Sequence, residues 1–296
     1  MKGFVVDIKN KVTENMVSIL ADKGWYHRQF SELRELLQSF FDEAPLFPFQ
    51  SIQALVMPHA GYSYSGYTAA VAAKQIEGHF FNRIIIIGPS HHVHLPHAAS
   101  IPLASGIVTP LGVAPLDTEV LLALSKHNLF KQVPKIDQDE HSVQIEIPFF
   151  QMLCPEVPIV PIVVGQLDQH SAQDIADALR PYIDPETLVV ISSDFTHYGK
   201  AFGYLPFSDH IPERIEQLDM SLIETLCGLN EDEVYRAFEI PRTVCGEHAF
   251  KVLAALFGDE LQGKCVHYDM SANKNQDWSH SVSYAGMVYE SLTGWV

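Results

Sequence analysis

Short apolar runs alternate with segments of helical periodicity along most of the chain. Apolar runs that predict buried strands cover Gln53–Met57, Arg83–Ile87, Ile159–Val164, Thr187–Ser192, Val266–Met270 and Val282–Tyr289. Helical spacing of apolar residues covers Ser31–Phe41, Tyr67–Glu77, Asp117–His127, Ala172–Tyr182, Ile211–Cys227 and Glu247–Phe257. Strands and helices that alternate in this way are typical of a mostly parallel sheet with helices on both faces. We therefore predict an α/β fold of this kind.

One segment fits both patterns. Residues 141–150, HSVQIEIPFF, alternate apolar and polar positions as a strand does, yet they follow DQDE, an acidic stretch typical of a helix start. Strand and helix are both left open for this segment.

The composition narrows the class of protein. Of the 296 residues, 47% are hydrophobic, and no linker or repeat divides the chain, so we expect one domain over residues 1–296. The formal charge of -17 disfavours nucleic acid as a partner, because phosphate backbones would be repelled. No apolar run approaches the roughly 18 residues of a membrane span, and the four cysteines form no dense framework. We therefore expect a cytoplasmic protein without a membrane partner.

Histidines gather where the predicted strands end. His59 follows the strand at 53–57, and His91 and His92 follow the isoleucine run at 84–87 through a Gly-Pro-Ser turn. Ligands of open parallel sheets bind at the carboxyl ends of the strands, where the strand-to-helix loops meet. Because a neutral imidazole is the commonest ligand of transition metals, these positions indicate a metal site.

Other reactive side chains occupy similar positions. Asp194 and His197 follow another predicted strand, and Cys245 stands directly before a predicted helix. A carboxylate near a histidine can orient its tautomer and tune its pKa for proton transfer. The helix start favours the thiolate of Cys245, which predicts a better metal ligand than the other cysteines. With His59 and His91, these residues predict one shared pocket around a metal that keeps open positions.

The acidic run DQDEHSVQIE, residues 137–146, has two interpretations. Runs of this kind are usually solvated loops or helix caps, and that is the default expectation here. The alternative is that Glu140 and His141 lie behind the metal ligands and support them.

Six motifs lie in a fixed order between about Gly24 and Tyr289: PHAGYSYSG, GPSHH, DEHSVQIEIPF, SSDFTHYG, CGEHAF and SVSYAGMVY. Together they resemble the Memo family, which is called protein B of the AmmeMemoRadiSam system in bacteria. Each motif alone is unspecific, whereas six in register are specific. The resemblance implies a fold similar to the catalytic subunits of class III extradiol dioxygenases, which cleave catechol rings at a non-haem Fe(II).

The resemblance also implies roles for single residues. His59, His91 and Cys245 match the family's metal-ligand positions, with a cysteine in place of the dioxygenase carboxylate. His197 matches the acid-base histidine. Fe(II) is the metal that the relation to dioxygenases implies, and the soft thiolate makes Cu(I) and Zn(II) alternatives.

Two functions fit these residues. The leading one is a metal-dependent redox enzyme for an unknown small molecule or peptide, in which His197 moves protons and Asp194 orients a histidine. Residues expected to line its pocket are Tyr62, Tyr64, His92, Glu140, His141 and His248. The alternative is a non-enzymatic protein that retains the pocket of a former active site and binds a peptide or small ligand there. A Ser-His-Asp hydrolase built on Ser193 or Ser90 is a weaker interpretation, because neither serine lies in a Gly-x-Ser-x-Gly turn.

Overall fold

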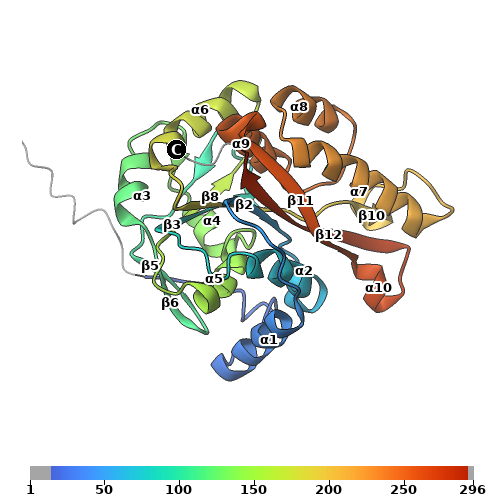
Figure 1. Cartoon of the computed structure of the whole chain (residues 1–296), viewed down its shortest axis with the longest axis horizontal. Helices are drawn as coiled ribbons and strands as arrows, with labels where there is room; N and C mark the ends of the chain where they lie inside the picture. The colour runs from blue at the N-terminus through green and yellow to red at the C-terminus, as the bar shows by residue number, and fades with distance from the viewer. Residues whose placement is uncertain (1–14, 293–296) are drawn as a thin grey trace, which may run out of the picture.

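The computed structural model describes residues 15–292, and one large mixed sheet forms its centre (Figure 1). The central strands are parallel and lie in the order β2 (Ile52–Met57), β9 (Thr187–Ser192), β3 (Arg83–Pro89) and β8 (Ile159–Val164). All residues of β2, β8 and β9 are buried. Burial on both faces explains why these strands are continuous apolar runs, and it confirms the predicted α/β class.

The edges of the sheet correct one part of the prediction. The long strand β12 (His280–Ser291) pairs antiparallel with β2 and with two further strands, β10 (His197–Gly199) and β11 (Leu261–Met270). Only the short α10 (Ser271–Asn275) joins β11 to β12, and a connection this short favours antiparallel pairing. The sheet is therefore mixed rather than mostly parallel.

Short strands complete the sheets. On the far side of β8, β4 (Ala99–Ser100) pairs antiparallel with it and parallel with β7 (Phe130–Lys131). A small separate sheet contains β1 (Met16–Val17), β5 (Gly106–Thr109) and β6 (Gly112–Pro115). Strands of two to four residues are too short to show a period, which is why the sequence does not reveal them.

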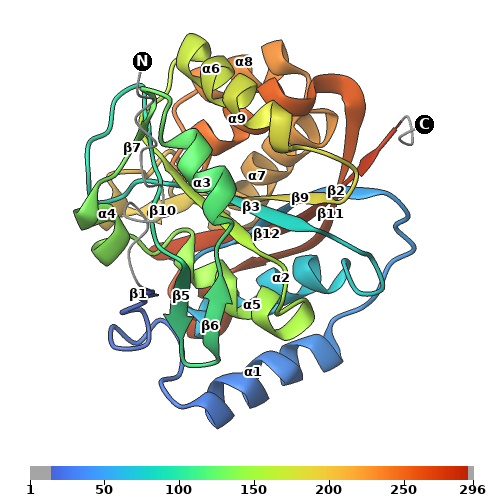
Figure 2. The same ribbon diagram turned by 90° about the vertical axis from the view of Figure 1, so that its left-hand side faces the viewer.

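Helices cover both faces of the large sheet (Figure 2). One face carries α6 (Gln169–Leu179), α7 (Ile211–Gly228), α8 (Glu231–Glu239) and α9 (Glu247–Phe257). The opposite face carries α1 (Phe30–Glu43), α2 (Tyr62–Lys74) and α5 (Ile147–Leu153). The short helices α3 (Thr118–Leu124) and α4 (Pro134–Asp139) lie in the connection between β6 and α5.

The segment with two interpretations is helical. A 3-10 turn at Gln144–Glu146 leads into α5, and Pro148 occupies the first turn of that helix, where its missing N–H is not needed. Residues 144–150 are all buried, so the apparent alternation of this segment does not separate an inner face from an outer one. The helix predicted at Tyr67–Glu77 begins earlier, at Tyr62, because the aromatic turn after Gly61 is already helical.

Two expectations concern the chain as a whole. None of the helices between residues 15 and 292 has the length and apolar character needed to cross a bilayer. The assignment of residues 1–296 to one domain stays a prediction, since residues 1–14 and 293–296 lie outside the described part.

Gly165, which follows β8, allows the loop after β3 to pass close by. A Cβ atom at Gly165 would lie 1.8 Å from the carbonyl oxygen of Leu95, whereas one at Gly228 would meet nothing within 4 Å. We predict that Gly165→Ala lowers the free energy of unfolding by more than about 2 kcal/mol, because backbone atoms must move. The control Gly228→Ala, at the end of α7, changes it by less than about 1 kcal/mol. Urea denaturation measures both, and equal effects would contradict the tight packing.

Candidate metal centre

His59 comes from the loop after β2 and is buried, with 1% of its surface exposed. Its Nδ1 lies 2.9 Å from Ser192 Oγ, while Nε2 is buried and has no hydrogen-bond partner within the described chain. Burial and the nearby His91 lower the pKa of His59 well below its usual value, so the ring is neutral. A buried nitrogen without a partner is unfavourable, which indicates a ligand at Nε2.

His91 comes from the loop after β3, and its side chain is 27% exposed. Its Nδ1 lies 2.9 Å from Glu140 Oε1, and its backbone N–H donates to Glu140 Oε2 at 2.6 Å. The rings of His59 and His91 meet edge to face with their centres 5.1 Å apart. A histidine whose Nδ1–H donates to a carboxylate presents Nε2 as a ligand, as metal-binding histidines usually do.

Cys245 precedes α9 and is held against the carboxyl end of β9. Its backbone N–H donates to the Asp194 carbonyl at 3.2 Å, and the Gly246 N–H donates to Ser193 Oγ at 2.9 Å. A Cβ atom at Gly246 would lie 2.4 Å from Ser193 Cβ, so only glycine allows this approach. The result is a cysteine fixed by backbone contacts to the strand beside it.

These three side chains converge. One ligand atom from each of His59, His91 and Cys245 lies within 4.8 Å of the other two. Because Ser192 and Glu140 engage the Nδ1 atoms, the two Nε2 atoms and Cys245 Sγ form the donor set. Two imidazoles and one thiolate suit a transition metal and leave coordination positions open. The buried Nε2 of His59 thus fits the metal that the sequence predicts.

The state of the Cys245 thiol differs from the sequence prediction. Burial and the nearby carboxyls of Asp194 and Glu140 raise its pKa well above the usual value. A position before a helix does not overcome these effects, so the metal-free side chain is a thiol rather than a thiolate. Metal binding must therefore remove the thiol proton.

His197 is placed to accept that proton. Its Nδ1 lies 2.9 Å from the carbonyl oxygens of Phe195 and Thr243, which can only accept, so Nδ1 carries a hydrogen. Its Nε2 lies 3.7 Å from Cys245 Sγ. With its hydrogen on Nδ1, the ring presents Nε2 to the thiol.

Asp194 holds a loop rather than a histidine ring. It is buried, with 4% of its surface exposed, and its Oδ1 accepts from the backbone N–H of His59 at 2.8 Å. Burial raises its pKa to about 6, although the nearby His197 and the hydrogen bond from the His59 N–H oppose this shift. The predicted role of orienting an imidazole belongs instead to Ser192 for His59 and to Glu140 for His91.

Glu140 and His141 lie inside the protein, so the default expectation of a solvated acidic run is wrong for them. Glu140 is 2% exposed and also accepts from the backbone N–H groups of His141 and Ser142. Burial raises its pKa, but the hydrogen bonds and charge of His91 outweigh this and lower it to about 2. His141 stacks between Trp25, at 4.2 Å, and His91, at 4.6 Å, and burial lowers its pKa to about 3.

Comparisons with known proteins agree with the motifs. The sequence profile of a family described as "Memo-like protein" matches residues 22–288. This chain belongs to the Memo-like family. It is 33% identical over 285 residues to "Protein MEMO1" of Danio rerio, covering 88% of this chain and 93% of that protein.

Relatives of this Memo-like chain occur in other lineages. "Protein MEMO1" of Homo sapiens is 31% identical over 282 residues, with 88% of this chain and 93% of that protein covered. A "MEMO1 family protein" of Thermococcus onnurineus is 29% identical over 290 residues, with 93% and 99% covered. The relatives match nearly the whole length of the Memo-like chain, so the resemblance seen in the sequence is confirmed.

The other predicted pocket residues are spread more widely. Tyr62 is 2% exposed, donates to the Ile145 carbonyl at 2.7 Å and packs against Phe149, so it belongs to the core. His92 is exposed, with its ring centre 6.5 Å from that of His91. Two further residues make polar contacts elsewhere: the Tyr64 carbonyl accepts from Lys274, and Nδ1 of His248 accepts from the backbone N–H of Leu167.

The hydrolase interpretation finds no support in the contacts of its serines. Ser193 Oγ donates to the Asp194 carbonyl at 2.8 Å and accepts from Gly246, while Ser90 Oγ donates to the Val93 carbonyl at 2.8 Å. His197 Nε2 faces a thiol rather than either serine. The Ser-His-Asp arrangement is therefore not formed within residues 15–292.

Sequence reasoning missed three supporting residues. Ser192 is the last residue of β9, so its sequence position predicts only a strand residue. Glu146 belongs to an acidic run that predicts solvent exposure, and Trp25 is distant in sequence from the six motifs.

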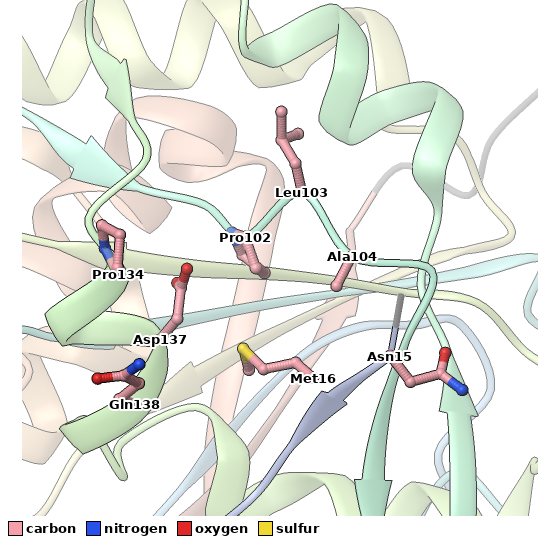
Figure 3. Close-up of a pocket in the computed structure, with 8 residues that line it drawn as sticks. All are labelled: Asn15, Met16, Pro102, Leu103, Ala104, Pro134, Asp137 and Gln138. Carbon is pink, nitrogen blue, oxygen red and sulfur yellow. The ribbon is translucent and has the colours of Figure 1, made fainter. Parts of the chain in front are cut away.

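A separate cavity of about 310 Å³ opens beside β1 and α4 (Figure 3). Its lining residues are Asn15, Met16, Pro102, Leu103, Ala104, Pro134, Asp137 and Gln138. It is lined by apolar groups, amides and one carboxyl, Asp137, whose pKa burial raises to about 6. This lining contains none of the three metal-ligand candidates.

Acid should destabilise the metal-free protein through His141. An unfolded histidine binds a proton near pH 6.5, but His141 in the folded protein does so only near its pKa of about 3. As the pH falls below 6.5, the unfolded state gains protons first, so stability falls. Between pH 7 and pH 5 we predict that His141→Gln loses about 2 kcal/mol less stability than the unsubstituted protein.

The measurement is urea denaturation at both pH values, with the exposed His170 changed to Gln as control. His170→Gln should follow the unsubstituted protein. The same acid loss in His141→Gln would show that His141 is not held neutral by burial.

Proposed function

We propose that this Memo-like protein binds one transition-metal ion through His59 Nε2, His91 Nε2 and Cys245 Sγ and uses it for redox chemistry. Fe(II) is the first choice of metal and Cu is the redox-active alternative, whereas Zn, which does not change oxidation state, would supply only a Lewis acid. The partner would be an unknown small molecule or peptide that enters the open positions. The supporting observation is the buried His59 Nε2, which has no partner within residues 15–292 and faces two further donors.

Several features favour a reactive centre over a purely structural one. Structural zinc sites usually have four protein ligands, whereas this donor set has three. His91 and His92 are exposed at the mouth, so a molecule can approach from solvent. When bound, the metal would supply a Lewis acid and an electron carrier with free positions.

Other residues of the chain would orient the ligands, move a proton and exclude water. Ser192 and Glu140 orient the two imidazoles from behind, which fixes their tautomers. His197 Nε2 takes the proton of the Cys245 thiol or of a bound molecule, while the carbonyls of Phe195 and Thr243 hold its Nδ1–H. His141 stacks against His91 and would exclude water from one side of it, while Trp25 stacks on His141.

Removing the thiol should weaken metal binding strongly. We predict that Cys245→Ala lowers the affinity for Zn(II) and Cu(I) by more than about 100-fold, because it deletes a direct ligand, whereas loss of a supporting residue costs about 10–100-fold. Cys154→Ala is the control, since Cys154 is also a free cysteine but lies outside the donor set. Chelator competition under anaerobic conditions measures the affinities. Unchanged affinity in Cys245→Ala would refute this ligand assignment.

Redox activity needs a separate experiment. Protein purified anaerobically and loaded with Fe(II) or Cu(I) is mixed with catechols or small thiols, and O2 consumption is recorded with Cys245→Ala as the reference. Consumption that depends on Cys245 supports an enzyme. A tightly bound metal without O2 consumption for any of these compounds would favour the non-enzymatic binding protein instead.

A further inference from the structure

Glu146 is a buried acid that the proposed metal site does not use directly. It ends the 3-10 turn before α5 and has 0% of its surface exposed. Its Oε1 lies 3.0 Å from Ser192 Oγ, and its Oε2 is buried without a hydrogen-bond partner in the described chain. An ionised carboxylate in such a position would be strongly unfavourable.

The hydrogen bonds of Ser192 reveal where the protons are. Three groups surround Ser192 Oγ: His59 Nδ1 at 2.9 Å, Glu146 Oε1 at 3.0 Å, and the carbonyl oxygen of Ser142. A hydroxyl group has one proton to donate and two lone pairs that accept. The Ser142 carbonyl can only accept, so it takes the hydroxyl proton.

Two protons must then come from the other neighbours. If Ser192 donates to Ser142, the lone pairs of Ser192 Oγ face His59 Nδ1 and Glu146 Oε1. Both contacts are favourable only when His59 carries its hydrogen on Nδ1 and Glu146 carries one on its carboxyl group. An ionised Glu146 would place two oxygen lone pairs against each other at 3.0 Å.

We propose that Glu146 is a neutral carboxylic acid that acts, through Ser192, as a positioning residue for His59, keeping Nδ1 protonated and Nε2 free for the metal. The metal part of this proposal rests on the proposed function, whereas the neutral acid and the tautomer do not. Burial raises the pKa of Glu146 well above its usual value. The Ser192 hydrogen bond opposes this shift and the nearby Asp194 adds to it, but burial is the largest effect, so the direction agrees with the proton count.

The two histidine ligands are thus supported in opposite ways. Glu140 is ionised and accepts directly from His91 Nδ1–H, whereas Glu146 is neutral and reaches His59 only through a serine. The carboxylate makes His91 the more electron-rich ligand. The neutral acid adds no charge to a site that already contains Glu140 and a thiol that becomes a thiolate.

Infrared spectroscopy of the metal-free protein tests the neutral acid. At pH 7 the difference spectrum between the unsubstituted protein and Glu146→Gln should contain the carbonyl band of a protonated carboxyl group, and the difference with Glu140→Gln should contain a carboxylate band instead. A carboxylate band in the Glu146→Gln difference would overturn the proposal. This result does not depend on metal binding, so it separates this proposal from the proposed function.

Metal affinity tests the positioning role. Glu146→Leu fills a similar volume but cannot donate to Ser192, so we predict an affinity for Zn(II) about tenfold lower. Glu146→Gln keeps a donor, because its amide replaces the acid, and should restore the affinity to within about threefold of the unsubstituted protein. Thermal unfolding of the metal-free variants identifies any that are simply misfolded. Equal affinities for Glu146→Leu and the unsubstituted protein, or an equally weak Glu146→Gln, would overturn the positioning role.

Discussion

The hydrogen bonds of three consecutive residues at the carboxyl end of β9 hold the site together. Ser192 contacts His59, Ser193 accepts from the residue after Cys245, and Asp194 bonds to the backbones of both His59 and Cys245. Because β9 lies between β2 and β3 in the sheet, its loop is adjacent to the loops that carry both histidine ligands. The bonds that involve the side chains of Ser192, Ser193 and Asp194 are buried, so losing one would leave unpaired polar groups, which are unfavourable inside a protein.

The charges at the site are arranged around this framework. Glu140 remains ionised because backbone N–H groups and His91 surround it, while Glu146 and the Cys245 thiol remain neutral because burial dominates. The histidines at the bottom of the site are neutral as well. Imidazoles with free lone pairs are ready to bind a metal, and the one proton that must leave is the thiol proton of Cys245.

Much of this could be predicted from the sequence, for identifiable reasons. Long apolar runs such as Ile159–Val164 are unambiguous for a buried parallel strand, and the rule that ligands bind at strand ends placed His59, His91 and Cys245 near each other. At Cys245 two effects on the thiol pKa oppose each other, because a helix start lowers it and burial raises it. The sequence could not show which effect is larger.

The burial of two acidic residues could not be predicted from the sequence, for a different reason. Glu140 and Glu146 belong to an acidic run, and nothing in the run distinguishes a solvated carboxyl from a buried one. Their burial depends on the loops of β3 and β9, which are far away in the sequence. The antiparallel edge of the sheet could have been predicted, because the connection between β11 and β12 is too short for the crossover that parallel strands need.

The most direct test of the central claim is X-ray absorption spectroscopy of the protein loaded with one equivalent of Zn(II), whose bond lengths identify its ligands. A centre formed by His59, His91 and Cys245 predicts one sulfur scatterer at about 2.3 Å together with nitrogen scatterers at about 2.0–2.1 Å that show the pattern of imidazole rings. A first shell of nitrogen and oxygen alone, without sulfur, would contradict it.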